Sequence, residues 1–246
     1  MSQTDPAPSA SHATTESVLE TILIDIVRGT YPPGARLPAE RELSRMLGAS
    51  RPTLREALRT LAEWRLVEPR RGSGVVVLNR NEWSIEVLPA YLRYATPSPG
   101  EASIPQILLD LLNMRRALIK DMVKVVADRF PPGASKKPRE AAAKAWASRH
   151  SIRDFVLADF AVMRAVVEGA NFLPAVWMLN RLSGVYIDIA SSLTGSMHPP
   201  EFYIEAHEQF LDALERGDAL AAVTMIDSYL GEHDKRVIAM LGGLDK

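Results

Sequence analysis

Three arginines, Arg51, Arg55 and Arg59, are spaced four residues apart and therefore share one face of any helix that contains them. The planar guanidinium group can donate two parallel hydrogen bonds to the O6 and N7 atoms of guanine, and it also matches phosphate. We interpret Arg59, like Arg45 before it, as a solvent-exposed residue paired with nearby glutamates. Arg51 and Arg55 are the arginines that we expect to contact DNA.

The apolar residues around these arginines predict two short helices. Leu43, Met46 and Leu47 supply the apolar face of the first helix, Gly48 can end it, and Ser50 can cap the next. The second helix faces a core through residues at helical spacing, Leu54, Ala57, Leu58 and Leu61. A helix packed against the core, followed by a basic helix that is exposed on one side, is typical of a helix-turn-helix.

Two β-prone runs, residues 66–69 and 74–78, follow the helix pair and flank a turn that contains Gly72. A two-stranded hairpin in this position is a wing. An amphipathic helix also begins near Thr15 and ends near Gly29. We therefore expect a winged helix-turn-helix at residues 14–80, preceded by a disordered lead-in at residues 1–13 that is rich in Ser, Ala, Pro and Thr.

The remainder of the chain repeats apolar residues three and four apart and carries no comparable strand pattern. After a linker at residues 81–103, we expect an antiparallel all-helical bundle over residues 104–246. The fold class is mainly α, and the bundle is the candidate effector-binding and dimerisation domain.

The charge differs between the two parts. Residues 16–80 contain 11 arginines and no lysine against 8 acidic residues, whereas residues 81–246 contain 18 basic and 21 acidic residues. This asymmetry indicates a nucleic-acid-binding module carried by a domain that does not touch nucleic acid. The chain has no cysteine and no run of about 18 apolar residues, and its first residues lack the pattern of a signal peptide. We expect a cytoplasmic protein without a membrane partner.

The segment YPPGARLPAERELSRMLGASRPTLREALRTL with the wing RRGSG resembles the GntR family of bacterial transcription regulators. The all-helical second part resembles the FadR subfamily. The resemblance implies a homodimer that binds a palindromic operator in double-stranded DNA. It also implies DNA contacts from the PAERE motif, the start of the recognition helix and the wing tip, which are here Arg41, Ser50, Arg51, Thr53, Arg55, Arg71 and Gly72.

Many FadR-subfamily domains bind a divalent metal through an Asp-x-x-x-His pair and two later histidines. Here Asp159 stands four residues before Met163, His207 matches the second histidine, and Tyr229 occupies the last position with His233 one turn further on. Thioether and phenol groups replace imidazole poorly at a zinc or nickel site. We therefore expect no metal.

Residues 171–186 and 202–214 resemble the acyl-CoA-responsive branch of the subfamily, which implies an acyl-CoA or fatty acyl effector and no further cofactor. Arg115 matches an arginine that faces the pocket and could pair with a carboxylate or phosphate. The candidate effector-binding residues are Arg115, Asp159, Met163, Trp177, Tyr186, His207, Tyr229 and His233. Further apolar candidates, which can equally pack the bundle, are Met178, Phe202, Phe210 and Met225.

Three alternatives remain open. The effector can be a small carboxylate instead of an acyl compound. The chain can be a helical metalloenzyme fused to a DNA-binding domain, with Glu205, Glu208 and Asp212 near His207 imitating a metal site, although their spacing equally fits a solvated face. The bundle can also serve dimerisation alone, without any ligand. We expect a regulator rather than an enzyme.

Overall fold

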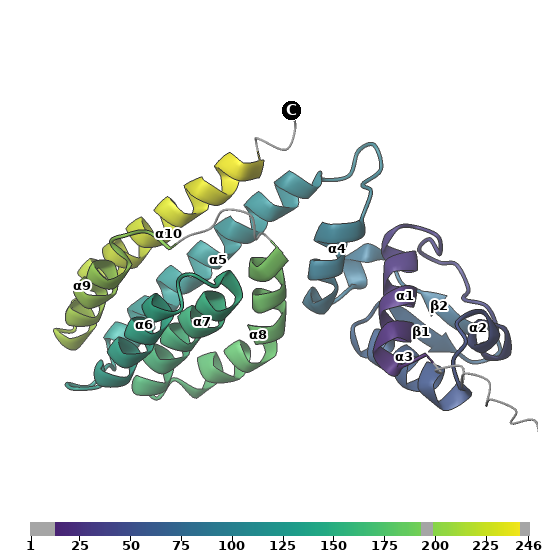
Figure 1. The fold of residues 1–246 in the computed structure, drawn as a ribbon, viewed down its shortest axis with the longest axis horizontal. Coiled ribbons are helices and arrows are strands. Elements are labelled where there is room, and N and C mark those ends of the chain that lie inside the picture. Colours follow the sequence, from purple (N-terminus) through teal and green to yellow (C-terminus); the bar gives the residue numbers. More distant parts are fainter. Residues whose placement is uncertain (1–12, 193–198, 242–246) are drawn as a thin grey trace, which may run out of the picture. The chain divides into compact units, whose positions relative to one another are not determined.

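The computed structural model describes residues 13–192 and 199–241, and the chain divides into two compact units, residues 1–96 and 97–246 (Figure 1). Each unit has its own hydrophobic core. The predicted disordered lead-in lies outside the described residues except for Ala13. None of the helices within the described ranges is long and apolar enough to cross a membrane.

The first unit is the predicted winged helix-turn-helix. Its elements are α1 (Thr15–Val27), α2 (Glu40–Met46), α3 (Arg51–Glu63), β1 (Val67–Arg70) and β2 (Gly74–Val77). The two strands pair antiparallel, with Val67 opposite Val77 and Arg70 opposite Gly74. Gly48 has a φ of 61°, so the left-handed turn that ends α2 falls where the sequence predicts it.

The core of this unit fixes the orientation of α3. Leu54 and Leu61 on α3 are fully buried and pack with Ile22 of α1 and with Leu66, which leads into β1. Since one side of α3 is committed to this core, the opposite side with Arg51, Arg55 and Arg59 is exposed.

The division between the units falls inside the predicted linker, residues 81–103, but the first part of that segment is folded. It forms two short 3₁₀ helices, η1 (Arg80–Glu82) and η2 (Ile85–Val87), and the helix α4 (Leu88–Tyr94). Val87 is buried in the core of the first unit. Trp83 and Tyr91 are partly buried against this core, and their two rings contact each other edge to face. Residues 81–95 therefore belong to the first unit, because their aromatic side chains are buried against it.

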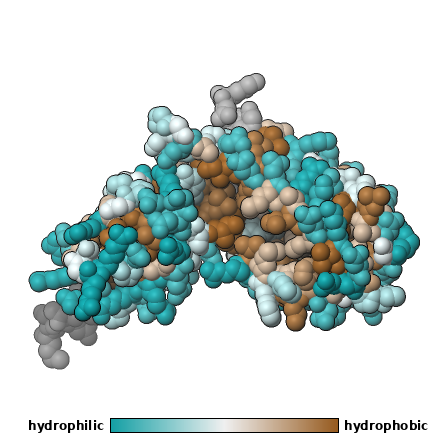
Figure 2. Space-filling model, turned by 180° about the vertical axis from the view of Figure 1, so that it is seen from behind, coloured by the Kyte–Doolittle hydropathy of each residue, from teal (hydrophilic) through white to brown (hydrophobic). Residues whose placement is uncertain are grey.

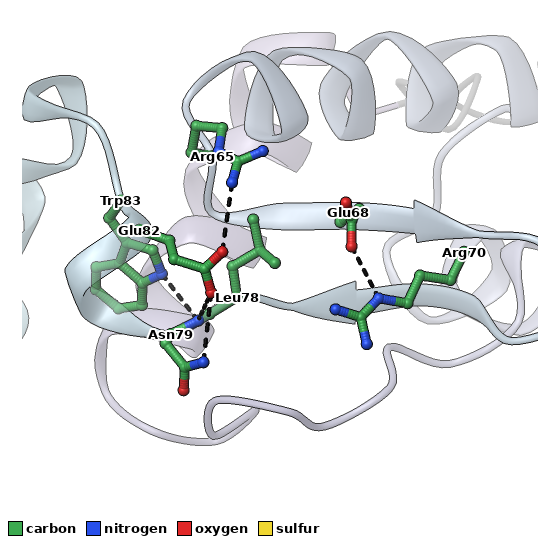
Figure 3. A network of polar contacts seen from close by, with 7 residues as sticks. All are labelled: Arg65, Glu68, Arg70, Leu78, Asn79, Glu82 and Trp83. Atoms are coloured by element: carbon green, nitrogen blue, oxygen red, sulfur yellow. Dashed lines mark hydrogen bonds and ion pairs between the residues drawn. The ribbon is translucent and has the colours of Figure 1, made fainter.

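Hydrogen bonds and an ion pair connect the start of the segment 80–95 to the residues that follow β2 and α3 (Figure 3). Arg65 donates to Glu82 over 3.3 Å, and the other Glu82 oxygen accepts from the backbone and side chain of Asn79, each at 3.3 Å. The Trp83 ring donates to the Leu78 carbonyl at 3.0 Å. The segment thus leaves β2 in a fixed direction.

The second unit is the predicted helical bundle. Its helices are α5 (Ile104–Ala127), α6 (Lys136–Ala147), α7 (Ile152–Gly169), α8 (Leu173–Ser192), α9 (Tyr203–Glu215) and α10 (Ala219–Leu241). Helices α5 and α10 lie side by side (Figure 1), and α7 packs against α6 and α8. Arg115 of α5 pairs with Asp234 of α10, and Lys120 with Asp227, so the two helices run antiparallel.

Candidate nucleic-acid interface and ligand cavity

The start of α3 carries a hydroxyl pair. The Ser50 hydroxyl caps the helix by accepting from the Thr53 backbone N–H at 3.2 Å, and the two side-chain oxygens lie 2.7 Å apart. The capped end leaves backbone N–H groups and the positive end of the helix dipole facing solvent. Hydroxyl groups in this position are suited to phosphate contacts.

The arginines on α3 differ in their partners. Arg55 donates to Glu40 of α2 at 2.9 Å, and Arg59 to Glu56 at 2.7 Å, whereas Arg51 has no ion pair among the described residues. An ion pair between such exposed groups contributes at most about 1 kcal/mol, so a DNA phosphate or base can replace Glu40 as the partner of Arg55. Arg59 is paired on the helix surface, as the sequence predicts.

The wing tip is a tight turn between β1 and β2. Gly72 and Gly74 have φ values of 76° and 77°, which side chains rarely tolerate, and the Ser73 N–H donates to the Arg70 carbonyl at 2.9 Å. The exposed side chain of Arg71 is carried by this turn. Together with Arg41 on α2, the helix start and the wing tip hold all seven residues that were predicted to contact DNA, and DNA contact by them stays a prediction.

The second unit contains a partly open cavity of about 80 Å³ between α5, α7, α8, α9 and α10. Five of its lining residues are polar or charged, namely Arg115, Asp159, Tyr186, His207 and Tyr229. The remaining lining is aliphatic, thioether or aromatic and includes Ile119, Met122, Val126, Val162, Met163, Val167, Phe210 and Ile226. Six of the eight predicted effector-binding residues therefore meet in one place, together with Phe210 from the further apolar candidates.

The polar groups gather toward one end of this cavity. Arg115 on α5 and Asp159 on α7 are the first lining residues of their helices, and every later lining residue on both helices is apolar. The lining of α5 ends at Val126, and at 1.5 Å per residue it extends about 16 Å from Arg115. A ligand with one charged end and one apolar end matches this distribution.

Asp159 is held by a tyrosine that the sequence analysis missed. The fully buried Tyr203 donates its hydroxyl to Asp159 at 2.7 Å, and its ring stacks on Trp146. His207 donates from Nδ1 to the Tyr203 carbonyl at 2.8 Å, which leaves Nε2 without the proton in the neutral ring. The spacing of four between Tyr203 and His207 on one helix was the available signal.

The tyrosines of the cavity stay protonated. Loss of hydration raises the pKa of Tyr186 to about 12, with the Asp159 carboxylate acting in the same direction and Arg115 in the opposite one. Burial, followed by the charge of Asp159, also raises the pKa of Tyr203 and that of Tyr229 far above the ordinary value. These phenols offer O–H groups, not anionic ligands.

The cavity does not fit a divalent metal. Asp159, Met163, His207 and Tyr229 do lie around it, as the subfamily pattern places them. A thioether and a phenol with a raised pKa are weak ligands for zinc or nickel, however, and the described residues contain no group of three or more His, Cys, Asp or Glu side chains suited to a metal.

Two predicted effector residues lie elsewhere. Trp177 is 65% exposed because it occupies the outer face of α8, so the expectation that it lines the pocket was wrong. His233 is not part of the lining, and its Nδ1 lies 3.5 Å from the Asp234 carboxylate. Of the further apolar candidates, Phe202 is exposed, and Met178 and Met225 are absent from the lining.

The acidic residues near His207 do not form a metal site. Glu208 and Asp212 both pair with Arg139 of α6, the latter at 2.5 Å, and Glu205 accepts from Gln209 at 3.1 Å. They form the solvated face that their spacing allowed.

The surface of the second unit is partly apolar. Figure 2 shows hydrophobic residues gathered on its visible face, whereas the visible face of the first unit is mostly hydrophilic. The exposed large apolar side chains of the second unit include Met114 and Leu118, one turn apart on α5.

A winged helix-turn-helix joined to a helical bundle with an internal cavity defines a DNA-binding regulator with an effector domain. Comparisons with known proteins agree. The family described as "Bacterial regulatory proteins, gntR family" matches residues 14–77, and the FCD domain matches residues 110–232. The chain belongs to the GntR family, in its FadR-type branch with a C-terminal FCD domain.

Two relatives and one structure illustrate the similarity. The HTH-type transcriptional regulator Mce2R of Mycobacterium tuberculosis is 27% identical over 243 residues, which cover 95% of each chain. The fatty acid metabolism regulator protein of Pectobacterium carotovorum is 30% identical over 171 residues, covering 69% of this chain and 68% of the relative. The structure of Lar from Listeria monocytogenes has a TM-score of 0.62 at 16% identity, covering 93% of this chain and 98% of that one, and shows the same fold.

Proposed function

We propose that this regulator is a cytoplasmic homodimer that binds a palindromic operator and loses affinity for it when a long-chain acyl-CoA or fatty acid occupies the helical domain. Several relatives that are about 30% identical carry the name fatty acid metabolism regulator protein, which supports this class of effector. The proposal joins that likeness to the chemistry of the cavity.

The observation that carries the proposal is the separation of charge and apolar surface within one cavity. Arg115 supplies a cation at one end, and over about 16 Å beyond it the residues of α5 that line the cavity are all apolar. A sugar acid or short hydroxy acid would leave this apolar lining without a partner. A fatty acyl chain with an anionic head group satisfies both ends.

The size of the cavity suggests how the ligand acts. An apolar cavity of about 150 Å³ is known to hold benzene, and the present cavity of about 80 Å³ is smaller. A long chain can therefore enter only if the helices around the cavity separate. The ligand weakens DNA binding to the extent that it prefers the separated state, and a tenfold loss of affinity requires about 1.4 kcal/mol of coupling.

Dimerisation supplies the DNA specificity. One winged helix offers few base contacts, and a two-fold pair doubles them on a palindrome. The exposed Met114 and Leu118 on α5 offer apolar surface for such a contact.

The experiment uses an operator selected from a genomic or random DNA pool with the purified protein. Acyl-CoAs and free fatty acids of 8 to about 18 carbons are titrated against the complex, and fluorescence anisotropy reports DNA release. We expect at least one long-chain compound to lower the affinity about tenfold or more. Release by a short hydroxy acid or sugar acid, with none by any acyl compound, would contradict the acyl effector and favour the small-carboxylate alternative. The absence of any ligand effect would favour a bundle that serves dimerisation alone.

A further inference from the structure

The cation of the cavity is already paired within the protein. Arg115 donates from Nη2 to Asp234 of α10 at 2.5 Å, and the two side chains are only 18% and 9% exposed. Asp159, which lines the cavity as Asp234 does not, accepts from Tyr203 instead. Asp234 therefore occupies the position beside Arg115 that the anionic head group of a ligand would need.

This arrangement leaves hydrogen-bonding groups unsatisfied on both sides of the pair. The Nε of Arg115 and the Nδ1 of His233 are buried and have no hydrogen-bond partner within the described part of the chain. The Nδ1 of His233 lies 3.5 Å from the Asp234 carboxylate, just beyond hydrogen-bond distance. A small movement of Asp234 would bring it into contact with His233. Asp234 accepts from Nη2 of Arg115, so the Nε of Arg115 remains available as a donor.

We propose that Asp234 is an internal competitor for the ligand. An anionic head group displaces the Asp234 carboxylate from Arg115 and also engages its free Nε, and Asp234 then accepts from His233. The inference rests on the proposed function, because it requires a ligand with an anionic head. The exchange keeps the buried guanidinium neutralised throughout, since an unpaired buried charge is strongly unfavourable.

The exchange also provides a route to regulation. The Arg115–Asp234 pair connects α5 to α10, two helices that both line the cavity. When the ligand takes Arg115, this connection is lost, and the helices can separate to admit the apolar chain. Binding of the head group and opening of the cavity thus favour each other.

The same two helices offer a matched control. Asp227 of α10 pairs with Arg116 of α5 at 2.6 Å and with Lys120 at 3.2 Å, and neither of these two cations lines the cavity, whereas Arg115 does. Asp227→Asn removes the same charge between the same helices without touching the head-group position.

The test compares wild type, Asp234→Asn and Asp227→Asn by isothermal titration with dodecanoate, dodecanoyl-CoA and 1-dodecanol. We expect Asp234→Asn to bind the anionic ligands about tenfold more tightly, which corresponds to about 1.4 kcal/mol. Its affinity for the neutral alcohol should rise less, because the alcohol gains from the loosened contact between α5 and α10 but does not bind the freed guanidinium. Asp227→Asn should match wild type for all three ligands. A gain for only one of the two anions identifies which head group displaces Asp234.

Other outcomes would overturn the inference. An equal gain for the alcohol would indicate general loosening of α5 and α10, and an equal gain in Asp227→Asn would indicate a long-range charge effect. Unchanged affinity of Asp234→Asn for every ligand that wild type binds would refute the competition but leave the proposed function intact. Failure of all three proteins to bind any of these compounds would refute the proposed function, and with it the inference.

A second variant covers the case in which Asp234→Asn does not fold. His233→Ala retains the Arg115–Asp234 pair but removes the group that receives the displaced carboxylate. We expect several-fold weaker binding of dodecanoate and dodecanoyl-CoA and unchanged binding of the alcohol. Unchanged binding of the anions in this variant would contradict the proposal independently.

Discussion

At the scale of single residues, the arginines of α3 have different surroundings despite their regular spacing. Arg59 pairs with Glu56 of its own helix, Arg55 reaches across to Glu40, and Arg51 has no partner among the described residues. The Arg59–Glu56 pair can persist when the protein binds DNA, whereas the side chains of Arg51 and Arg55 are available to contact the DNA. Mutation of the three arginines in turn therefore tests which of them contact DNA.

Arg51→Ala and Arg55→Ala should each weaken operator binding by about 1 to 3 kcal/mol if the side chain contacts a base edge. Arg59→Ala should change the affinity little, because that side chain is paired on the helix surface. Anisotropy titrations at fixed salt measure all three, since salt alone shifts such affinities strongly. Normal operator affinity in both the Arg51 and the Arg55 variants would refute the assignment of α3 as the recognition helix.

Tyr186 makes the stability of the protein depend on alkaline pH. Its pKa in the folded state is about 12 against about 10 in the unfolded chain, so the stabilisation is complete below pH 10 and is lost as the pH rises toward 12. The loss is about 1.4 kcal/mol per pH unit over this range. In Tyr186→Phe, the urea midpoint followed by circular dichroism should fall less steeply between pH 10 and 11 than in wild type. Identical slopes would contradict the raised pKa, and a comparison at pH 8 controls for the change in packing.

At the scale of elements, local patterns predicted much more than distant contacts. The helix-turn-helix and wing follow from local caps, glycines and apolar spacing, and the structure agrees except at Met46, which was placed on the apolar face of α2 but is 57% exposed. For the bundle, helical spacing identified apolar faces but not which faces converge, so Trp177 was placed in the cavity although it lies outside. Asp234 was missed because its partner is 119 residues away in the chain.

The segment from η1 to α4 is the element that the sequence did not predict. It was expected to be linker, yet Trp83 and Tyr91 pack against the core of the first unit and Glu82 is bonded to Arg65 and Asn79. Short helices such as η1, η2 and α4 carry weak sequence signals, because they depend on tertiary packing, here that of the aromatic rings, for their stability.

Trp83→Ala should release this segment. We expect amide hydrogen exchange over residues 85–95 to accelerate about tenfold or more. In the variant, local opening of the segment no longer carries the free-energy cost of exposing a packed indole ring to water. Exchange in α5 to α10 should be unchanged, which serves as the internal control. Protection of residues 85–95 that equals wild type would mean that these rings do not hold the segment.

At the scale of the whole molecule, no metal is required for the fold or for DNA binding by this account. Met163 and Tyr229 are poor ligands beside Asp159 and His207, so EDTA should leave both the melting temperature and the operator affinity nearly unchanged. Differential scanning fluorimetry and elemental analysis of the purified protein provide the measurement. Stoichiometric zinc or nickel, with a large loss of stability on chelation, would show that this cavity is a metal site.

The chain that follows Thr96 joins the two units. Insertion of about ten Gly and Ser residues between Pro99 and Gly100 introduces a flexible coil between the units. Under the proposed function, the variant should bind dodecanoyl-CoA as wild type does, because the cavity lies wholly within the second unit. The ligand should no longer weaken operator binding, since its preference for one state of the bundle cannot reach the recognition helices. Titration of the ligand against the operator complex compares the variant with wild type, and thermal unfolding confirms that both units remain folded. Full ligand-induced release of DNA by the variant would show that the coupling does not depend on this connection.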